Sequence, residues 1–197
     1  MLKPRIFFFA AVSLTAALTL SSCAGAGPTA ESSNSAETTV PAAFNDADVL
    51  FAQMMLPHHE QAVKMSDDLL TKDGIDQGVL DLAGEIKATQ TPEIAQLKGW
   101  LTEWNADDNS MSGMGGMGDG SNGMMSDEDM MALQDASGTD ASGLFLTQMT
   151  AHHQGAVAMA QLEVDNGENS DAQAMAANIV KTQTAEIAVM AKLLATL

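Results

Sequence analysis

The four histidines of this 197-residue chain occur as two adjacent pairs, each with a methionine at helical spacing. The pairs are His58-His59 and His152-His153, ninety-four residues apart. Met55 and Met149 stand three residues before the first histidine of each pair, so a thioether and an imidazole would share one face of a helix. Neutral imidazole nitrogen and thioether sulfur suit copper, Cu(I) above all, whereas Mg²⁺ and Ca²⁺ prefer oxygen. The spacing predicts a copper site that favours Cu(I), with Cu(II) as a second possibility.

The histidine pairs belong to an internal duplication. The segment 51–65 recurs at 145–159, and a Gln-x-x-Glu-Ile segment follows each copy. Within each copy, apolar residues and the first histidine recur every three or four residues, as on the buried face of a helix. Two helical hairpins with exposed apolar faces bury those faces against each other. We therefore predict an all-α four-helix bundle of two duplicated hairpins, with a Met/Gly-rich connecting loop, a short extra helix and no sheet.

Other residues of the predicted helices extend the candidate site. Met54, Met65 and Met159 lie close to the histidines along the chain, although methionine is also an ordinary core residue. Glutamine and glutamate fall in or beside the apolar stripe of the second helix of each hairpin. These residues are Gln90, Glu93, Gln183 and Glu186. They could orient the imidazoles by hydrogen bonds, the glutamates could ligate directly, or all four could bond the histidines in a metal-free core.

The helical pattern also predicts how the histidines are arranged. His58 and His152 fall on the core line, and the second histidine of each pair lies about 100° further round the helix. In an up-down-up-down bundle the two histidine helices are parallel and diagonal, so that a metal would span a gap of about 12 to 14 Å. Pro57 lacks an N–H and predicts a kink or local opening just before His58. Because only neutral imidazole ligates, copper affinity is expected to weaken as pH falls through about 6.5.

The connection between the two hairpins carries a second candidate site. Seven methionines fall between Met111 and Met131, where the first part of the segment has too much glycine for a stable element. Their spacing resembles the methionine clusters of extracytoplasmic copper proteins, and a flexible, oxidation-prone linker is the alternative. The candidate ligands here are Met111, Met114, Met117, Met124 and Met125. Ser126-Asp-Glu-Asp129 then predicts a capping box that opens a short helix ending by Gly138.

The N-terminal residues have the features of a lipoprotein signal peptide. Lys3 and Arg5 precede an apolar run to Leu20 that is short for a membrane span. Leu20-Ser-Ser-Cys23 resembles a lipobox, and Cys23 is the one cysteine of the chain. We predict a signal peptide at 1–22, a flexible tether at 23–45 and a folded domain at 46–197, with hairpins at 46–105 and 140–197 and the linker with its short helix at 106–139. The protein is expected to be extracytoplasmic and lipid-anchored to the bacterial cell membrane through Cys23.

Charge and missing motifs exclude several classes of function. The formal net charge of −18 argues against nucleic acid and anionic lipid surfaces as partners, so membrane contact is expected through the lipid anchor only. The sequence lacks Gly-x-Ser-x-Gly and a phosphate-binding loop. It also lacks the Glu-x-x-His of di-iron bundles. We predict that the protein is not an enzyme. A metal-free envelope interaction protein and, with less support, a ferritin-like metal-dependent oxidase are the alternatives.

The doubled Met-x-x-His-His-x-x-Ala-Val-x-Met segments, the Gln-x-x-Glu-Ile segments and the Met/Gly-rich connection resemble the bacterial domain-of-unknown-function (DUF) family 305 from residue 46 to 197. The resemblance implies a ferritin-like four-helix bundle, often secreted or lipid-anchored, with copper binding linked to copper tolerance in some members. The resemblance implies that the histidines and methionines of the family's motif correspond to His58, His59, His152, His153, Met55, Met65, Met149 and Met159. The Met/Gly connection lacks histidine, which argues against a tight Cu(II) site there. The resulting hypothesis is an extracytoplasmic copper-binding lipoprotein that sequesters copper or hands it to a transfer protein.

Overall fold

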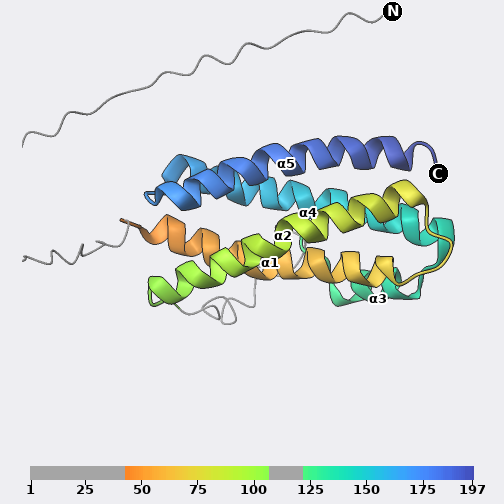
Figure 1. Ribbon diagram of the computed structural model, residues 1–197, viewed down its shortest axis with the longest axis horizontal. Helices are drawn as coiled ribbons and strands as arrows, with labels where there is room; N and C mark the ends of the chain where they lie inside the picture. Colours follow the sequence, from red (N-terminus) through yellow and green to blue (C-terminus); the bar gives the residue numbers. More distant parts are fainter. Residues whose placement is uncertain (1–42, 107–121) are drawn as a thin grey trace, which may run out of the picture. The chain divides into compact units, whose positions relative to one another are not determined.

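The computed structural model describes residues 43–106 and 122–197. Four long helices form the bundle, namely α1 (Asp46–Leu70), α2 (Gln77–Glu103), α4 (Gly138–Asn166) and α5 (Ser170–Leu194), and α3 (Asp127–Asp135) is the short extra helix. The described residues contain no strand (Figure 1). The predicted all-α fold of two helical hairpins with a short extra helix is therefore confirmed. The predicted signal peptide, Cys23 and the candidate ligands Met111, Met114 and Met117 lie outside the described residues.

Side chains that accept hydrogen bonds from free backbone N–H groups define where α1, α2, α3 and α5 begin. Asn45 caps α1, and Asp48 completes the capping box by accepting from the Asn45 N–H at 2.6 Å. The capping box predicted from Ser126 to Asp129 opens α3, which ends at Asp135. The turn between α1 and α2 uses Gly74 at φ +73°, a conformation that favours glycine.

The two hairpins meet through α1 and α4, which pack directly against each other in antiparallel directions. The start of α1 touches the end of α4, because the Asn45 side chain donates to the Asn166 carbonyl at 2.9 Å. At the other end, the Asp76 N–H donates to the Ser142 hydroxyl near the start of α4 at 3.2 Å. The parallel, diagonal arrangement predicted for the histidine helices is therefore wrong. The cause is the connection, since α2 ends at one end of the bundle and α4 begins at the other (Figure 1).

The core divides into two clusters, each of which mixes residues from both copies of the repeat. Phe51 and Met55 of the first copy share one cluster with Met159 of the second. Met65 of the first copy shares the other cluster with Phe145 of the second. This exchange of equivalent residues relates the copies by an approximate twofold axis. The axis crosses the α1–α4 interface at the level of the first histidine of each pair.

Helix α1 runs through Pro57 without interruption. The local opening of the helix predicted before His58 is therefore wrong. The proline is exposed to solvent, whereas its neighbours His58 and Leu56 are buried. The buried face of α1, on the side opposite the ring of Pro57, packs against α4, and this packing keeps the helix from opening.

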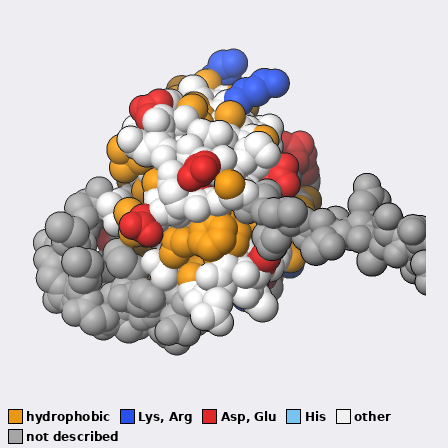
Figure 2. Space-filling model, turned by 90° about the vertical axis from the view of Figure 1, so that its left-hand side faces the viewer, with side chains coloured by type: hydrophobic (Ala, Val, Ile, Leu, Met, Phe, Trp, Pro, Cys, Tyr) orange, Lys and Arg blue, Asp and Glu red, His pale blue; other side chains and the backbone are white. Residues whose placement is uncertain are grey.

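Hydrophobic side chains reach the surface at the end of the bundle where α1 and α5 begin. Figure 2 views the molecule from this side and shows hydrophobic side chains gathered among acidic ones. Phe44, Leu50 and Leu162 are exposed in this part of the molecule, Leu162 to 62 %. None of the helices in 43–106 and 122–197 combines the length and the apolarity that crossing a membrane requires.

Candidate metal centre

The first histidines of the two pairs meet at the centre of the α1–α4 interface. His58 and His152 are 1 % and 0 % exposed, and their ring centroids lie 3.7 Å apart with the planes tilted by 37°. Each ring comes from the same position of its repeat. The antiparallel packing brings these equivalent positions together on the approximate twofold axis. The structure therefore places side by side the two imidazoles that the sequence indicated as core residues.

Hydrogen bonding leaves nitrogen atoms of this central pair free to bind. The Nε2 of His58 lies 3.0 Å from the carbonyl oxygen of Asn122, and because a carbonyl only accepts, Nε2 carries the proton. Its Nδ1 therefore holds a lone pair, and this atom is buried without a partner among the described residues. Both ring nitrogens of His152 are likewise buried and without a partner there. Buried polar atoms are normally hydrogen-bonded, so unpaired ones call for a functional reason.

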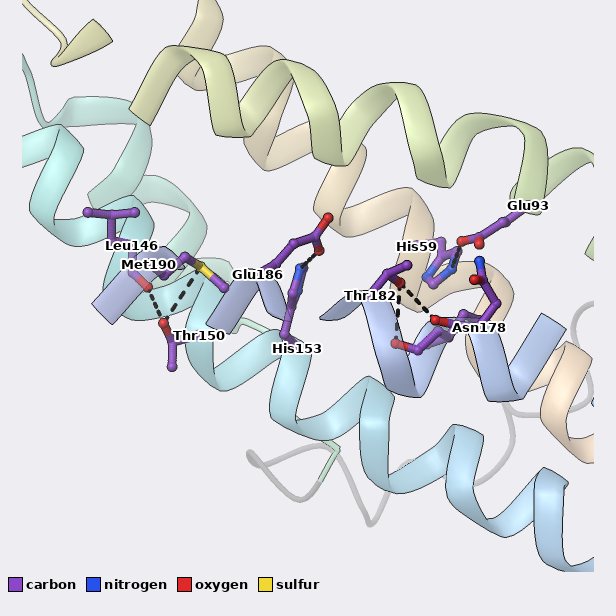
Figure 3. Close-up of polar contacts among 10 residues, drawn as sticks. His59, Glu93, Leu146, Thr150, His153, Asn178, Thr182, Glu186 and Met190 are labelled. Atoms are coloured by element: carbon purple, nitrogen blue, oxygen red, sulfur yellow. Dashed lines mark hydrogen bonds and ion pairs between the residues drawn. The ribbon is translucent and has the colours of Figure 1, made fainter. Parts of the chain in front are cut away.

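The second histidine of each pair is bound by the glutamate of its own hairpin. The Nε2 of His59 lies 2.8 Å from Oε2 of Glu93, and the Nε2 of His153 lies 2.7 Å from Oε2 of Glu186 (Figure 3). Both histidines are 0 % exposed, and the Nδ1 of each has no partner within the described part of the chain. An imidazole that donates one N–H to a carboxylate and leaves its other nitrogen free is the usual arrangement around a protein-bound metal.

Gln90 and Gln183, which the sequence also placed in the stripe, are 2 % and 3 % exposed. The Oε1 atom of each is buried with no partner among the described residues. The structure therefore does not use these amides as acceptors for the histidines. The glutamates fill that role for the second histidine of each pair.

Burial keeps the central imidazoles neutral. Loss of hydration, together with the neighbouring His59 and His153, lowers the pKa of His58 to about 3, although the hydrogen bond to Asn122 opposes the change. Burial also holds the pKa of His152 well below 6.5, and the other three histidines lower it further. For this pair, the lowered pKa moves the expected loss of copper affinity to pH values well below 6.5. Protons compete with a metal for His58 only in far more acidic solution.

The candidate methionines surround the histidines at different depths. Met55, Met149 and Met65 are fully buried and Met159 is 7 % exposed, while Met54 is half-buried. Two of them belong to each core cluster, Met55 and Met159 to one and Met149 and Met65 to the other. Thioethers therefore stand on both sides of the central imidazole pair. In the connection, Met124 is 36 % exposed and Met125 is half-buried.

This donor set suits a soft ion with few ligands better than a hard or highly charged one. No group of three or more His, Cys, Asp or Glu side chains within 43–106 and 122–197 is arranged around a common point. The central rings are in contact, so an ion held by both requires them to turn apart. Neutral imidazoles and thioethers provide no charge to offset a divalent ion, but they match the preference of Cu(I) for soft, neutral donors.

The backbone segment 122–125 covers the central histidines, which the sequence did not reveal. The side chain of Gln61 holds this segment by donating to the Met125 carbonyl at 2.8 Å and accepting from the Met125 N–H at 2.7 Å. The equivalent position of the second copy is Gly155, and a Cβ there would lie 1.8 Å from the Asn122 carbonyl oxygen. The two copies differ at this position for that reason. Their divergence from Gln to Gly within a repeated motif is the signal that could have revealed the contact.

Replacing Gly155 by alanine should displace the 122–125 segment from the histidines. Alanine favours a helix by about 1 kcal/mol over glycine, but overpacking against Asn122 should cost about 1 to 3 kcal/mol. We therefore expect a net loss of stability in chemical unfolding. Gly84→Ala is the matched control, because a Cβ at Gly84 meets nothing within 4 Å, and it should stabilise the protein. An equal gain from both substitutions would contradict the close contact.

The fold and the site together define a class of protein, a duplicated four-helix bundle with buried, neutral histidines at the contact between its two halves. The chain belongs to the family described as Domain of unknown function (DUF305), which it matches over residues 48–194. No curated protein shows significant similarity to it.

Solved structures with the same fold include members of this family. The chain is 37 % identical to the putative secreted DUF305 protein from Streptomyces coelicolor, with a TM-score of 0.69 over 76 % of this chain and 93 % of the other. It is 28 % identical to a DUF305 fragment from Deinococcus radiodurans, with a TM-score of 0.66 over 78 % and 98 % of the two chains. The protein CopM in its Cu(II)-bound form is 29 % identical, with a TM-score of 0.64 over 76 % and 96 %. CopM also matches in a Cu(I)-bound form at 29 % identity, with a TM-score of 0.59 over 74 % and 94 %.

Proposed function

We propose that this protein binds copper, favouring Cu(I), through its buried histidines and the adjacent methionines, and that it sequesters the metal or passes it to another protein. The observation that carries the proposal is the central pair, whose neutral imidazoles keep unpaired nitrogens in the core. Leaving such atoms unpaired costs about 1 to 3 kcal/mol each. A metal ion bound to these nitrogens would offset that cost. A purely structural role for the histidines does not explain why the nitrogens are left unpaired.

The arrangement of the outer histidines supports the same role. Glu93 and Glu186 hold the proton on Nε2 of their histidines, which leaves Nδ1 available for a metal. Similarity to CopM, which has been solved with Cu(I) and Cu(II), adds independent support at 29 % identity. Cu(II) is a second candidate ion, although the donor set on the described residues favours the monovalent state.

The proposed setting is outside the cytoplasm. The signal-like N-terminus and Cys23 favour a lipid-anchored protein of the bacterial cell membrane. The role is proposed to be non-catalytic, with copper as cargo and a copper-transfer protein as a possible partner. The methionines of the connection, from Met111 to Met125, would add soft ligands that collect the ion near the bundle.

Anaerobic titration of the protein with Cu(I), followed by metal analysis after gel filtration, tests the proposal. We expect at least one tightly bound ion per chain, and retention of that ion when a competing Cu(I) chelator is added. A variant that lacks residues 111–121 separates the two kinds of site, because it should keep the tight ion and lose only weaker binding. Failure of the intact domain to retain Cu(I) would favour a metal-free interaction protein instead.

A further inference from the structure

A pocket beside the central histidines is lined by three methionines from separate parts of the chain. Met54 comes from α1, Met159 from α4 and Met124 from the end of the Met/Gly-rich connection. The pocket has a volume of about 160 Å³, and His58 forms part of its wall. Three thioethers that meet beside an imidazole provide a soft ligand set.

The residues that line this pocket range from exposed to fully buried. Met124 is 36 % exposed, Met54 is half-buried, Met159 is 7 % exposed and His58 is 1 % exposed. The wall of the pocket therefore includes a residue at the surface, one of the two central histidines and the methionines between these extremes of exposure. Methionine is an ordinary core residue, but core packing does not account for the exposed Met124 in the same pocket.

The second copy of the repeat carries no methionine at the position of Met54. The position equivalent to Met54 is Gln148, which is 6 % exposed and donates to the Asp129 carbonyl of α3 at 2.9 Å. Helix α3 packs against both α1 and α4 and adds Leu133 to the core cluster of that half. Within the described residues, α3 thus covers the half of the α1–α4 interface that contains Gln148, and the pocket of the three methionines lies in the other half. The two copies have therefore diverged at this position, where Met54 lines the pocket in the first copy and Gln148 binds α3 in the second.

We propose that this thioether pocket, formed by Met54, Met124 and Met159, is the route by which Cu(I) reaches the buried histidines. The inference rests on the proposed function and adds to it a site of uptake distinct from the site of retention. Thioethers bind Cu(I) without needing to lose a proton, and they exchange it readily because they are neutral. The ion therefore moves between sulfur ligands of decreasing exposure and never passes bare through apolar side chains, where an isolated charge is costly.

The rate of copper uptake tests the pocket separately from the final site. The metal-free protein is mixed anaerobically with Cu(I) as its bicinchoninate complex. Loss of the colour of this complex is followed by stopped flow. Met54→Leu/Met124→Leu removes the two outer sulfurs while nearly conserving volume. We expect uptake to slow by about tenfold or more, while the ion at the central histidines is still bound once equilibrium is reached. The matched control is Met131→Leu/Met175→Leu, which changes an exposed and a half-buried methionine outside the pocket and should leave the rate unaltered.

The possible outcomes separate the pocket from the proposed function. Uptake by the double variant at the rate of the control would overturn the pocket as a route while leaving copper binding intact. Loss of one bound ion with no change in the rate for the remaining copper would also overturn it, since the pocket would then be an independent store. Absence of Cu(I) binding by the unaltered protein would instead refute the function on which the inference rests. Met124→Leu alone, at an exposed position, should slow uptake in the same direction if the double variant folds poorly.

Discussion

Replacing both central histidines by leucine is expected to abolish stabilisation by copper and to make the metal-free protein more stable. A site filled at a thousandfold excess over its Kd stabilises a protein by about 4 kcal/mol, or roughly 10 °C in Tm for a chain of this size. His58→Leu/His152→Leu removes that effect with the ligands. It also removes three buried nitrogens that lack partners in the described residues, and we expect on the order of 1 kcal/mol of added stability without metal.

Thermal unfolding with and without Cu(I) under anaerobic conditions measures both effects. Ser66→Ala is the matched control, because the Ser66 hydroxyl is also buried with no partner among the described residues but offers no soft ligand. The control should gain stability without metal and keep the full shift with copper. A leucine variant that keeps its copper shift would show that the ion binds elsewhere. A leucine variant that is less stable without metal would favour histidines retained for packing.

The second large effect is expected from Glu163, a buried carboxyl at the end of α4. Burial, together with the neighbouring Asp48 carboxylate, raises the pKa of Glu163 to about 8. Burial by itself would raise the pKa of Asp48, but hydrogen bonds from the N–H groups of Asn45, Asn169 and Glu168 outweigh burial and lower this pKa. At neutral pH the folded protein therefore holds a proton on Glu163 that an unfolded chain would release.

The direction of the resulting pH dependence follows from the raised pKa. Below about pH 4.5 Glu163 is protonated in both the folded and the unfolded chain, so it does not change the free energy of unfolding. As pH rises from 4.5 towards 8, only the folded chain keeps this proton, and stability is lost progressively. Glu163→Gln mimics the protonated acid at every pH. The variant should match the parent protein near pH 4.5 and exceed its stability by on the order of 3 kcal/mol at pH 7.5.

Urea unfolding at several pH values measures this difference. Glu168→Gln is the control, because Glu168 is an exposed carboxyl in the adjacent turn, and it should leave the pH dependence of the parent unchanged. Parallel curves for Glu163→Gln and the parent protein would contradict a proton held on Glu163. The effect is independent of copper, since the Asp48–Glu163 pair lies at the end of the bundle and the histidines at its centre.

The helices and the candidate ligands could be predicted because their signals are local. Apolar spacing in 51–65 and 145–159 and the capping box at Ser126 each depend on residues close together in the chain. Duplication added the inference that two hairpins pack together. The resemblance to the family pointed to the same histidines, and the structure places them all in the core.

The contacts between the two copies could not be predicted in the same way. The sequence leaves open whether the connection from α2 returns along the bundle, and its return makes α1 and α4 antiparallel neighbours rather than parallel and diagonal helices. Asp48 and Glu163 carried no signal, because the repeat has Ser142 and Leu69 in their places. The two residues meet only because α1 begins where α4 ends.

The sequence by itself determined which residues are available, namely two pairs of imidazoles with thioethers at helical spacing on four amphipathic helices. Only the tertiary structure decided that His58 meets His152, that Glu93 and Glu186 bind the other two rings, and that the backbone at Asn122 covers the centre. The physical reason is range. Helical periodicity acts over a few residues, whereas the desolvation that chiefly lowers the pKa of the central histidines depends on how distant segments are brought together.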